Sequence, residues 1–183
     1  MKNALILHGT GANPHANWFD WLKELLEKNG YTVWVPELPG AEHPDMKRYK
    51  EFIFSSDFDF NAETVVVGHS SGAVAALSIL EALPENIIVD TAVMVGVYRP
   101  ELHGYSSKEP IDTSKVAGKA KKLVFVHSDD DPFCPLDGAR YFVDELHAEL
   151  VLLPGNDHFS YELNPKHNEL PELVKILQLK ESR

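Results

Sequence analysis

The stretch that decides the fold is Thr64-Val65-Val66-Val67-Gly68-His69-Ser70-Ser71-Gly72-Ala73-Val74-Ala75-Ala76. It predicts a buried strand that turns sharply into a helix through Gly-x-Ser-x-Gly, with Ser70 at the centre. Such a nucleophile elbow leaves no room for side chains at positions 68 and 72, which explains the two glycines. The helix that begins behind Ser70 offers free N–H groups and the positive end of its dipole. The stretch therefore indicates a nucleophilic serine, and the alternative is that Ser70 only caps a helix.

The composition is that of an ordinary globular protein, and its length suits one domain over residues 1–183. Seventeen basic against 28 acidic residues give a net charge of −11, which makes nucleic acid and anionic membranes poor partners. The only cysteine, Cys134, excludes an intramolecular disulfide and fits a reducing compartment. The apolar run after Lys2 is too short for a signal peptide, so we expect a cytoplasmic protein.

The rest of the chain alternates expected strands with expected helices. Several strands are continuous runs of valine, isoleucine and leucine, which is typical of parallel strands covered on both faces. The pattern predicts an α/β fold with a mostly parallel sheet of about six strands and helices on both faces. The expected strands are 4–7, 31–35, 64–69, 90–95, 122–126 and 149–153, and the expected helices are 18–28, 46–54, 71–83, 136–146 and 170–179. Asn17 is the expected N-cap of the first helix.

One connection, residues 98–121, is unusually long and polar and is interrupted by Pro100, Gly104, Pro110 and Gly118. Long connections in compact domains are commonly functional or mobile. It leaves the carboxyl end of a strand, where open α/β sheets place their sites. We expect a small flap here, or alternatively an irregular crossover with a short helix.

A serine hydroxyl needs a base to take its proton, and the base needs a carboxylate to orient it. Two later segments supply these groups in the order serine, acid, histidine. One strand ends in an acidic turn that contains Asp130 and Asp131, and the next ends in a turn that presents His158. Pro132 biases Asp131 towards extended geometry, so Asp131 is the preferred acid and Asp130 the reserve.

The other histidines are weaker candidates for the base. His69 lies inside the elbow, beside the serine rather than facing it, and is expected to pack or to make a local hydrogen bond. His8 precedes the first loop and is expected to shape the oxyanion region rather than to transfer protons. His127 is expected to pack under the acidic turn. The remaining five are expected in loops or on helix surfaces: His15, His43, His103, His147 and His167.

Acyl transfer also needs donors for the developing oxyanion. The fold supplies the N–H of the residue after the nucleophile, Ser71, and one from the loop after the first strand. In that loop Thr10 is the first candidate and Gly11 the second.

With these residues placed, the chain resembles the small α/β-hydrolase-fold serine hydrolases that include the human retinoblastoma-binding serine hydrolase and its bacterial relatives. The resemblance rests on residues 68–73, on Asp130-Asp131-Pro132-Phe133 with Pro135, and on His158-Phe159. It implies a compact three-layer α/β-hydrolase fold with little or no cap domain, and a catalytic triad of Ser70, Asp131 and His158. Asp157 departs from the glycine that the family usually has before the histidine. A Leu-x-Cys-x-Glu segment is absent, so retinoblastoma binding is not carried over.

The sequence thus predicts a serine hydrolase that cleaves small acyl esters through an acyl-enzyme, with no cofactor and no metal. The expected partner is a small-molecule ester, and protein partners stay open. Trp18, Phe159 and residues 98–121 are candidates to line the site. The alternatives are a non-catalytic binding or regulatory protein on a hydrolase scaffold, and a peptidase or thioesterase of the same fold.

Overall fold

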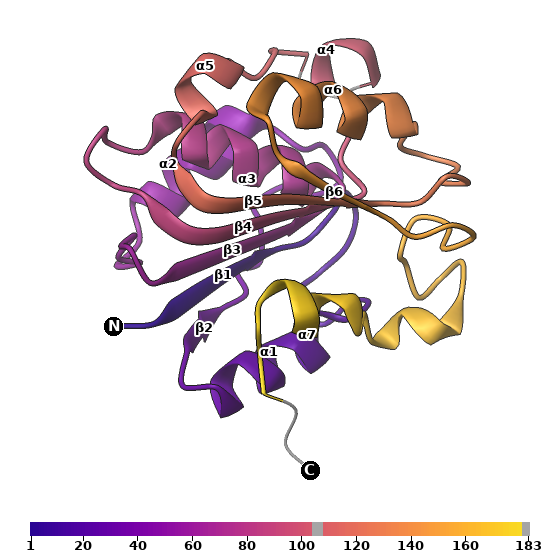
Figure 1. Cartoon of the computed structure of the whole chain (residues 1–183), viewed down its shortest axis with the longest axis horizontal. Helices are drawn as coiled ribbons and strands as arrows, with labels where there is room; N and C mark the ends of the chain where they lie inside the picture. The colour runs from indigo at the N-terminus through magenta and orange to yellow at the C-terminus, as the bar shows by residue number, and fades with distance from the viewer. Residues whose placement is uncertain (104–107, 181–183) are drawn as a thin grey trace.

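The computed structural model describes residues 1–103 and 108–180, which form a six-stranded sheet with helices on both faces (Figure 1). All neighbouring strands pair in parallel, in the order β2-β1-β3-β4-β5-β6. The strands are β1 (Asn3–Leu7), β2 (Thr32–Trp34), β3 (Thr64–His69), β4 (Val89–Val95), β5 (Ala120–His127) and β6 (Glu149–Leu152). This architecture confirms the predicted α/β-hydrolase fold.

The helices divide between the two faces of the sheet (Figure 1). One face is covered by α1 (Phe19–Lys28) and α7 (Glu172–Ile176), and the other by α2 (Met46–Phe54), α3 (Ser71–Ala82), α5 (Thr113–Val116) and α6 (Leu136–Leu146). A short α4 (Pro100–His103) precedes α5, and a 3₁₀ helix, η1 (Pro165–Asn168), precedes α7. β3 lies inside the sheet and every one of its residues is buried, as the continuous apolar run predicted.

Each face of the sheet has its own apolar core. Below α3, Leu77 packs in a cluster with Phe125 and Phe142. On the opposite face, Phe19 packs in a second cluster with Leu173. Because β-strand side chains alternate between faces, the same strands supply both clusters.

The ends of the helices follow local signals, with one exception. Asp45 caps α2, since its side chain accepts a 2.8 Å hydrogen bond from the amide of Arg48. Asn17, however, is not the N-cap of α1; Trp18 holds that position without a side-chain hydrogen bond. Asn17 adopts a left-handed φ of 52°, and its side-chain oxygen accepts from the amide of Tyr161 at 2.9 Å. A contact with a distant loop has replaced the predicted cap.

The turn from β3 into α3 brings the start of the helix directly against β1. A Cβ at Gly72 would lie 2.2 Å from the carbonyl oxygen of Leu7 and 2.6 Å from that of His8. A Cβ at Gly68 would lie 2.3 Å from the carbonyl oxygen of Gly72. The predicted requirement for glycine at both positions is confirmed, because no side chain fits between these backbones.

Residues 98–121 cross from β4 to β5 through α4 and α5. Asp112 caps α5 by accepting from the amide of Ser114 at 3.1 Å, and Val116 is buried in the cluster below α3. Gly104 lies outside the described residues. That this segment acts as a flap stays a prediction, as does the assignment of residues 1–183 to one domain.

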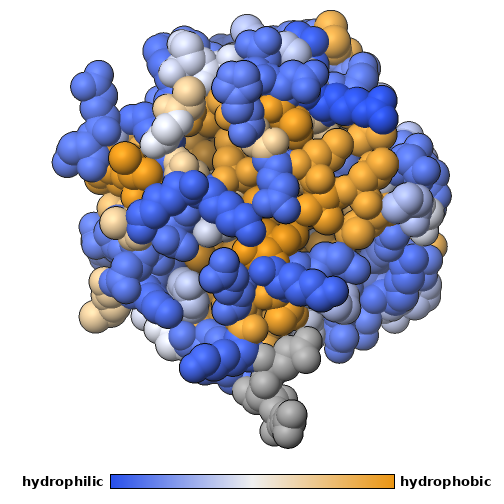
Figure 2. Space-filling model, in the orientation of Figure 1, coloured by the Kyte–Doolittle hydropathy of each residue, from blue (hydrophilic) through white to orange (hydrophobic). Residues whose placement is uncertain are grey.

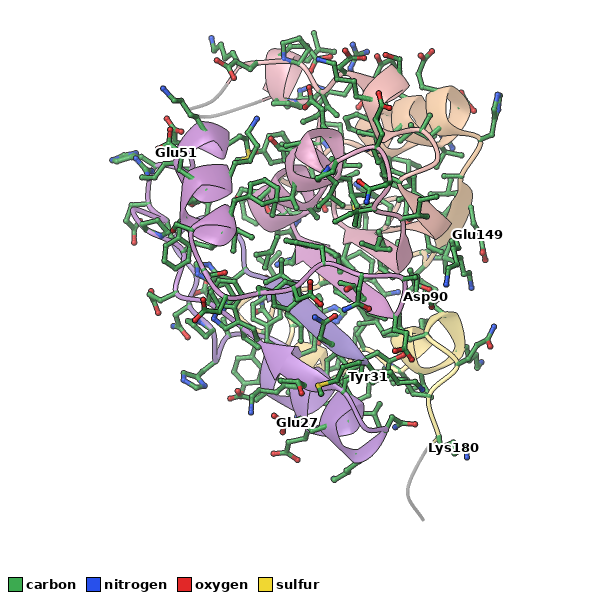
Figure 3. All side chains as sticks on the ribbon, turned by 90° about the vertical axis from the view of Figure 1, so that its left-hand side faces the viewer. Glu27, Tyr31, Glu51, Asp90, Glu149 and Lys180 are labelled. Atoms are coloured by element: carbon green, nitrogen blue, oxygen red, sulfur yellow. The ribbon has the colours of Figure 1, made fainter. Side chains whose placement is uncertain are left out.

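Charged side chains lie on the surface of both helices and strands. In Figure 3 the side chains of Glu27, Glu51 and Glu149 extend outwards from α1, α2 and β6. Figure 2 shows an apolar area between hydrophilic residues on the side where β6 forms the open edge of the sheet, and there Leu152 is 38% exposed. Among the described residues, no helix combines the length and apolar character needed to cross a membrane.

The close contact at the elbow leads to a prediction about stability. We expect Gly72→Ala to lower the free energy of unfolding by more than about 3 kcal/mol, because the new methyl group overlaps backbone atoms that cannot move independently. Urea denaturation followed by circular dichroism measures the change.

The matched control is Gly118→Ala. Unlike Gly72, Gly118 has a left-handed φ, of 76°, but a Cβ there meets no atom within 4 Å. We expect this variant to lose only about 1–2 kcal/mol from backbone strain. Equal losses in the two variants would contradict the steric explanation.

Candidate active site

Ser70 stands at the carboxyl end of β3 in a strained backbone conformation. Its φ is 56° and its ψ −121°, a region that few residues other than glycine adopt. Its amide donates a 2.9 Å hydrogen bond to the carbonyl of Val95, which ties the elbow to the end of β4. This is the geometry predicted for a nucleophile elbow.

His158 and Asp131 form a hydrogen-bonded pair at the ends of the last two strands. Nδ1 of His158 lies 2.7 Å from Oδ2 of Asp131, whose side chain is only 1% exposed. The other carboxylate oxygen accepts from the amides of Phe133 and Cys134, at 2.9 and 2.8 Å. Burial alone would raise the pKa of Asp131, but these hydrogen bonds and the nearby imidazole lower it below its usual value.

Ser70 and this pair meet at the end of β4. Gly96 follows Val95, the residue that accepts from the Ser70 amide, and has a φ of 60°. A Cβ at Gly96 would lie 3.3 Å from Nδ1 of His158 and 3.5 Å from Oδ2 of Asp131. Within the described residues, Ser70 and His158 share no direct side-chain hydrogen bond. Such contacts are often long before substrate binds.

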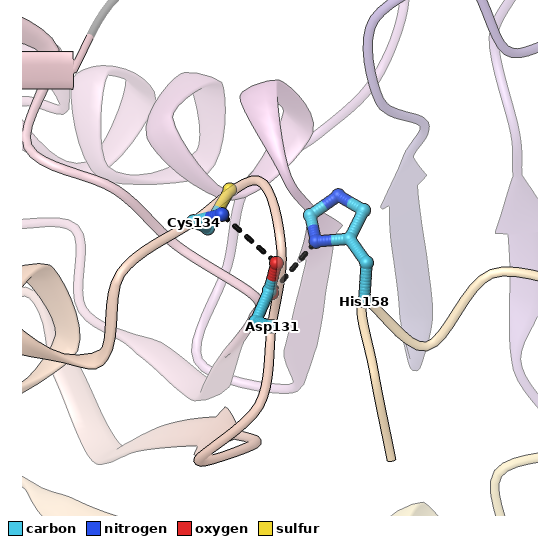
Figure 4. A group of neighbouring side chains, drawn as sticks. All are labelled: Asp131, Cys134 and His158. Atoms are coloured by element: carbon cyan, nitrogen blue, oxygen red, sulfur yellow. Dashed lines mark hydrogen bonds and ion pairs between the residues drawn. The ribbon is translucent and has the colours of Figure 1, made fainter. Parts of the chain in front are cut away.

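Cys134 also lies beside Asp131 and Ser70, a position that was not predicted from the sequence. Cys134 is 2% exposed, and Asp131 lies between it and His158 (Figure 4). Burial and the Asp131 carboxylate raise the pKa of the Cys134 thiol, and contact with the Ser70 hydroxyl opposes that rise. The ligand atoms of Asp131, Cys134 and His158 all lie within 4.8 Å of one another.

The two aspartates before Asp131 hold the histidine loop. Asp129 accepts a hydrogen bond from the amide of Gly155 at 3.0 Å. Asp130 accepts from the amide of Asp157 at 3.0 Å and from the hydroxyl of Ser128 at 2.5 Å. Both aspartates thus bind the backbone around the histidine, so Asp130 does not face the imidazole.

His69 is a fully buried neutral histidine that links the elbow to the histidine loop. Its Nε2 donates to the carbonyl oxygen of His158 at 2.7 Å, and its Nδ1 lies 3.5 Å from the side-chain amide of Asn17. Burial, with the nearby His158, lowers the pKa of His69 to about 3. The expected packing of His69 is confirmed, but its hydrogen bond joins residues 89 positions apart and is not local.

His8 and His127 are also buried and bonded to backbone. Nδ1 of His8 lies 3.0 Å from the carbonyl of Gly9, and its Nε2 accepts from the amide of Leu38 at 3.0 Å. Nε2 of His127 lies 3.2 Å from the carbonyl of Val97. His8 therefore holds the first loop against the loop after β2, and His127 lies under the acidic turn.

Thr10 and Ser71, the two candidate oxyanion residues, lie side by side. The hydroxyl of Thr10 donates to that of Ser71 at 3.1 Å. Ser71 is the first residue of α3, so its amide is among those without an intrahelical acceptor. In the described part of the chain, the amide of Thr10 also has no hydrogen-bond partner. The sequence had assigned no role to the Thr10 side chain.

Two residues expected to line the site do not do so. Trp18 and Phe159 are each 0% exposed and belong to the apolar cluster beneath α1 and α7. Phe133 takes the exposed position instead: it is 49% exposed, and its ring meets that of His158 edge to face at 5.2 Å. Because Phe133 directly follows the Asp-Pro of the acidic turn, its position was readable from the sequence, although its exposure was not.

Two surface hollows of about 340 and 320 Å³ lie away from Ser70. Ile88 lines the first, Tyr31 and Asp90 line the second, and Lys121 lines both. These residues stand near the amino ends of the strands, and Figure 3 shows Tyr31 and Asp90 on that part of the surface. In parallel α/β sheets the chemistry lies at the opposite edge.

Comparison with known proteins shows the family of the chain. The family described as Serine hydrolase matches residues 4–179. Serine hydrolase RBBP9 of Rattus norvegicus is 26% identical over 184 residues, which cover 95% of this chain and 94% of that protein.

Solved structures share the fold. The ydeN gene product of B. subtilis is 23% identical, with a TM-score of 0.87 over 97% of both chains. Est1E from Butyrivibrio proteoclasticus, solved with ferulic acid bound, is 16% identical, with a TM-score of 0.70 over 97% of this chain and 90% of that one. At these identities the likeness concerns the fold alone.

The buried His69 leads to a prediction about pH and stability. Its pKa is about 3 in the folded protein against 6.5 as the ordinary value, so below pH 6.5 the unfolded chain binds the extra proton. Stability therefore falls as the pH drops from 6.5 towards 3, by about 1.4 kcal/mol per pH unit from this group. Burial also lowers the pKa of His8 and of His167, so these two groups add to the loss of stability at low pH.

Urea denaturation at a series of pH values measures this slope. We expect His69→Gln, which retains an N–H donor, to flatten it between pH 6 and 4. The control is His15→Gln, because the His15 side chain is 79% exposed. A slope unchanged by His69→Gln would contradict the assignment.

Proposed function

The chain belongs to the serine hydrolase family and is an α/β-hydrolase enzyme, and from this premise we propose that it is a carboxylesterase-like hydrolase of small acyl esters. In this proposal Ser70 is the nucleophile, His158 the general base and Asp131 the group that orients it. The observation that carries the proposal is the 2.7 Å contact between Nδ1 of His158 and Asp131, beside a serine held at a strained elbow.

The contact fixes the tautomer of His158. A carboxylate only accepts hydrogen bonds, so the proton between the two groups belongs to Nδ1. Nε2 of His158 is then unprotonated and can take the proton of the Ser70 hydroxyl. The lowered pKa of Asp131 keeps its charge in place to stabilise the imidazolium that forms.

The reaction then has two similar steps, acylation of Ser70 and hydrolysis of the acyl-enzyme. Ser70 Oγ attacks the ester carbonyl while its proton passes to His158, and the tetrahedral intermediate collapses as His158 returns the proton to the leaving alcohol. Water attacks the acyl-enzyme with His158 again as base, which releases the acid and restores the Ser70 hydroxyl. No metal or cofactor takes part in these steps.

The amides of Ser71 and Thr10 are the proposed oxyanion donors. The Thr10 hydroxyl binds the Ser71 hydroxyl, which keeps the first loop and the start of α3 at a fixed separation. Each such donor typically lowers the barrier by about 2.7–4 kcal/mol. The buried His8 supports the same loop from behind.

Short acyl groups are the proposed substrates, for two reasons. The described residues between β4 and β5 contribute two helices of four residues each, which leaves little chain to enclose a long lipid. At the rim, the exposed ring of Phe133 against His158 offers an apolar contact to a small acyl or aryl group.

The proposed role of Ser70 as the nucleophile can be tested with an active-site probe and with model esters. We expect the wild-type protein to react with a fluorophosphonate probe and to hydrolyse p-nitrophenyl acetate and butyrate faster than long-chain esters. We expect Ser70→Ala to lose labelling, with a fall in kcat of about 10⁴-fold or more.

A folded wild-type protein that fails to label would overturn the proposal. An aminopeptidase substrate and an acyl-CoA, measured beside the esters, separate the two nearest alternatives. If either is hydrolysed faster than every ester, the proposed substrate class is wrong, but the assignment of Ser70 as the nucleophile is unaffected.

The second prediction separates the two candidate acids. We expect Asp131→Asn to lower kcat by about 10⁴-fold, because an asparagine presents the wrong partner to the imidazole. Asp130→Asn disturbs only the loop that carries His158, and we expect a loss of at most about 100-fold. The reverse order of losses would show that Asp130 is the acid.

A further inference from the structure

We propose that Asp131, Cys134 and His158 form an inhibitory binding site for Zn²⁺. Their carboxylate oxygen, thiol sulfur and imidazole nitrogen lie within 4.8 Å of one another, with Asp131 in the middle (Figure 4). No second group of three such ligands lies within residues 1–103 and 108–180. The metal takes no part in the proposed reaction.

The donor set suits Zn²⁺ better than a hard cation. Zn²⁺ binds sulfur, imidazole nitrogen and carboxylate oxygen at about 2.0–2.3 Å, whereas Mg²⁺ and Ca²⁺ prefer oxygen ligands alone. Around one tetrahedral ion these atoms would be about 3.5 Å apart. To bind one ion, the Nδ1–Oδ2 pair must open from 2.7 Å by about 0.8 Å, and any pair near the 4.8 Å limit must close by about 1.3 Å, so forming the site needs side-chain movements of about 1 Å.

The backbone already holds the third ligand close. The amide of Cys134 donates to Oδ1 of Asp131 at 2.8 Å, so the two residues belong to one tight turn. All three side chains have little contact with water: residue exposures are 2% for Cys134 and 7% for His158, and the Asp131 side chain is 1% exposed. Three protein ligands leave a fourth position for water.

Binding rearranges two protons. The Cys134 thiol releases its proton to solvent and binds as the thiolate, so one proton leaves for each ion bound. The proton on Nδ1 of His158 moves through solvent to Nε2, and Nδ1 binds the ion. Asp131 turns from the imidazole to the metal.

Inhibition follows from the new tautomer. With Nε2 protonated and Nδ1 on the metal, His158 cannot accept the proton of Ser70. This consequence rests on the function proposed above, whereas the metal site itself does not. Replacing Cys134 should remove the metal site; because its thiol contacts the Ser70 hydroxyl, the inhibition of each variant is measured relative to that variant's own metal-free rate.

The first experiment measures inhibition. Hydrolysis of p-nitrophenyl acetate is followed in a metal-free, thiol-free buffer as Zn²⁺ is added, for wild type, Cys134→Ala and Cys134→Ser. We expect wild type to be inhibited and rescued by EDTA, and Mg²⁺ to have no effect. In both variants the half-inhibiting concentration should rise by at least about tenfold, since even outer-shell partners contribute 10–100-fold to affinity. Equal inhibition of all three proteins would overturn the proposal.

The second experiment needs no activity. Co²⁺ replaces Zn²⁺, and a cobalt–thiolate charge-transfer band is sought in wild type and in Ser70→Ala. Because Cys134 is the only cysteine in the chain, the band identifies this site even if its variants fail to fold. Absence of the band in folded wild type would overturn the metal site. If the band appears in a protein that hydrolyses no ester, the metal site is supported and the proposed function is overturned. If the protein hydrolyses esters but shows no band, the proposed function is supported and the metal site is overturned.

Discussion

A contact between two backbones, with no side chain between them, determines the rest of this structure. The start of α3 presses on the end of β1, so close that a methyl group on Gly72 would overlap the carbonyl oxygen of Leu7. The chain can leave β3 only by the sharp turn that gives Ser70 its positive φ. The same contact sets the first loop beside the helix, where the hydroxyl groups of Thr10 and Ser71 meet. A requirement of packing thus also places a nucleophile and two free amides.

A second constraint is the division of tasks within three adjacent carboxylates. Asp129 and Asp130 bind amides of the histidine loop, and Asp131 receives the imidazole itself. By binding backbone amides, Asp129 and Asp130 hold the loop that carries His158 at a fixed distance from Asp131. The loop needs this support, because Asp157 and Phe159 on either side of the histidine both have positive φ values. The carboxylates therefore determine the position of the His158 loop as well as the site of the proton on the imidazole.

The sequence predicted what depends on local pattern. Periodicity located every strand and the bounds of α6, and the order serine, acid, histidine placed three residues that the fold brings to one edge. The prediction failed where a distant contact overrides a local signal. Asn17 looks like a helix cap but binds the loop after His158, and Trp18 is buried rather than lining the site. Cys134 reaches the site because Oδ1 of Asp131 accepts hydrogen bonds from the amides of Phe133 and Cys134, a local turn that the prediction did not include.

The order of the strands has a consequence for how activity is lost. The nucleophile follows β3, inside the sheet, whereas the acid and the base follow β5 and β6 at one end of it. β6 has four residues and a single neighbour, and it is the last strand before the histidine. Edge elements with few contacts open at a lower free energy than the whole fold. Fraying at β6 would separate base from acid while the elbow stays assembled, so heat can inactivate the protein before it unfolds.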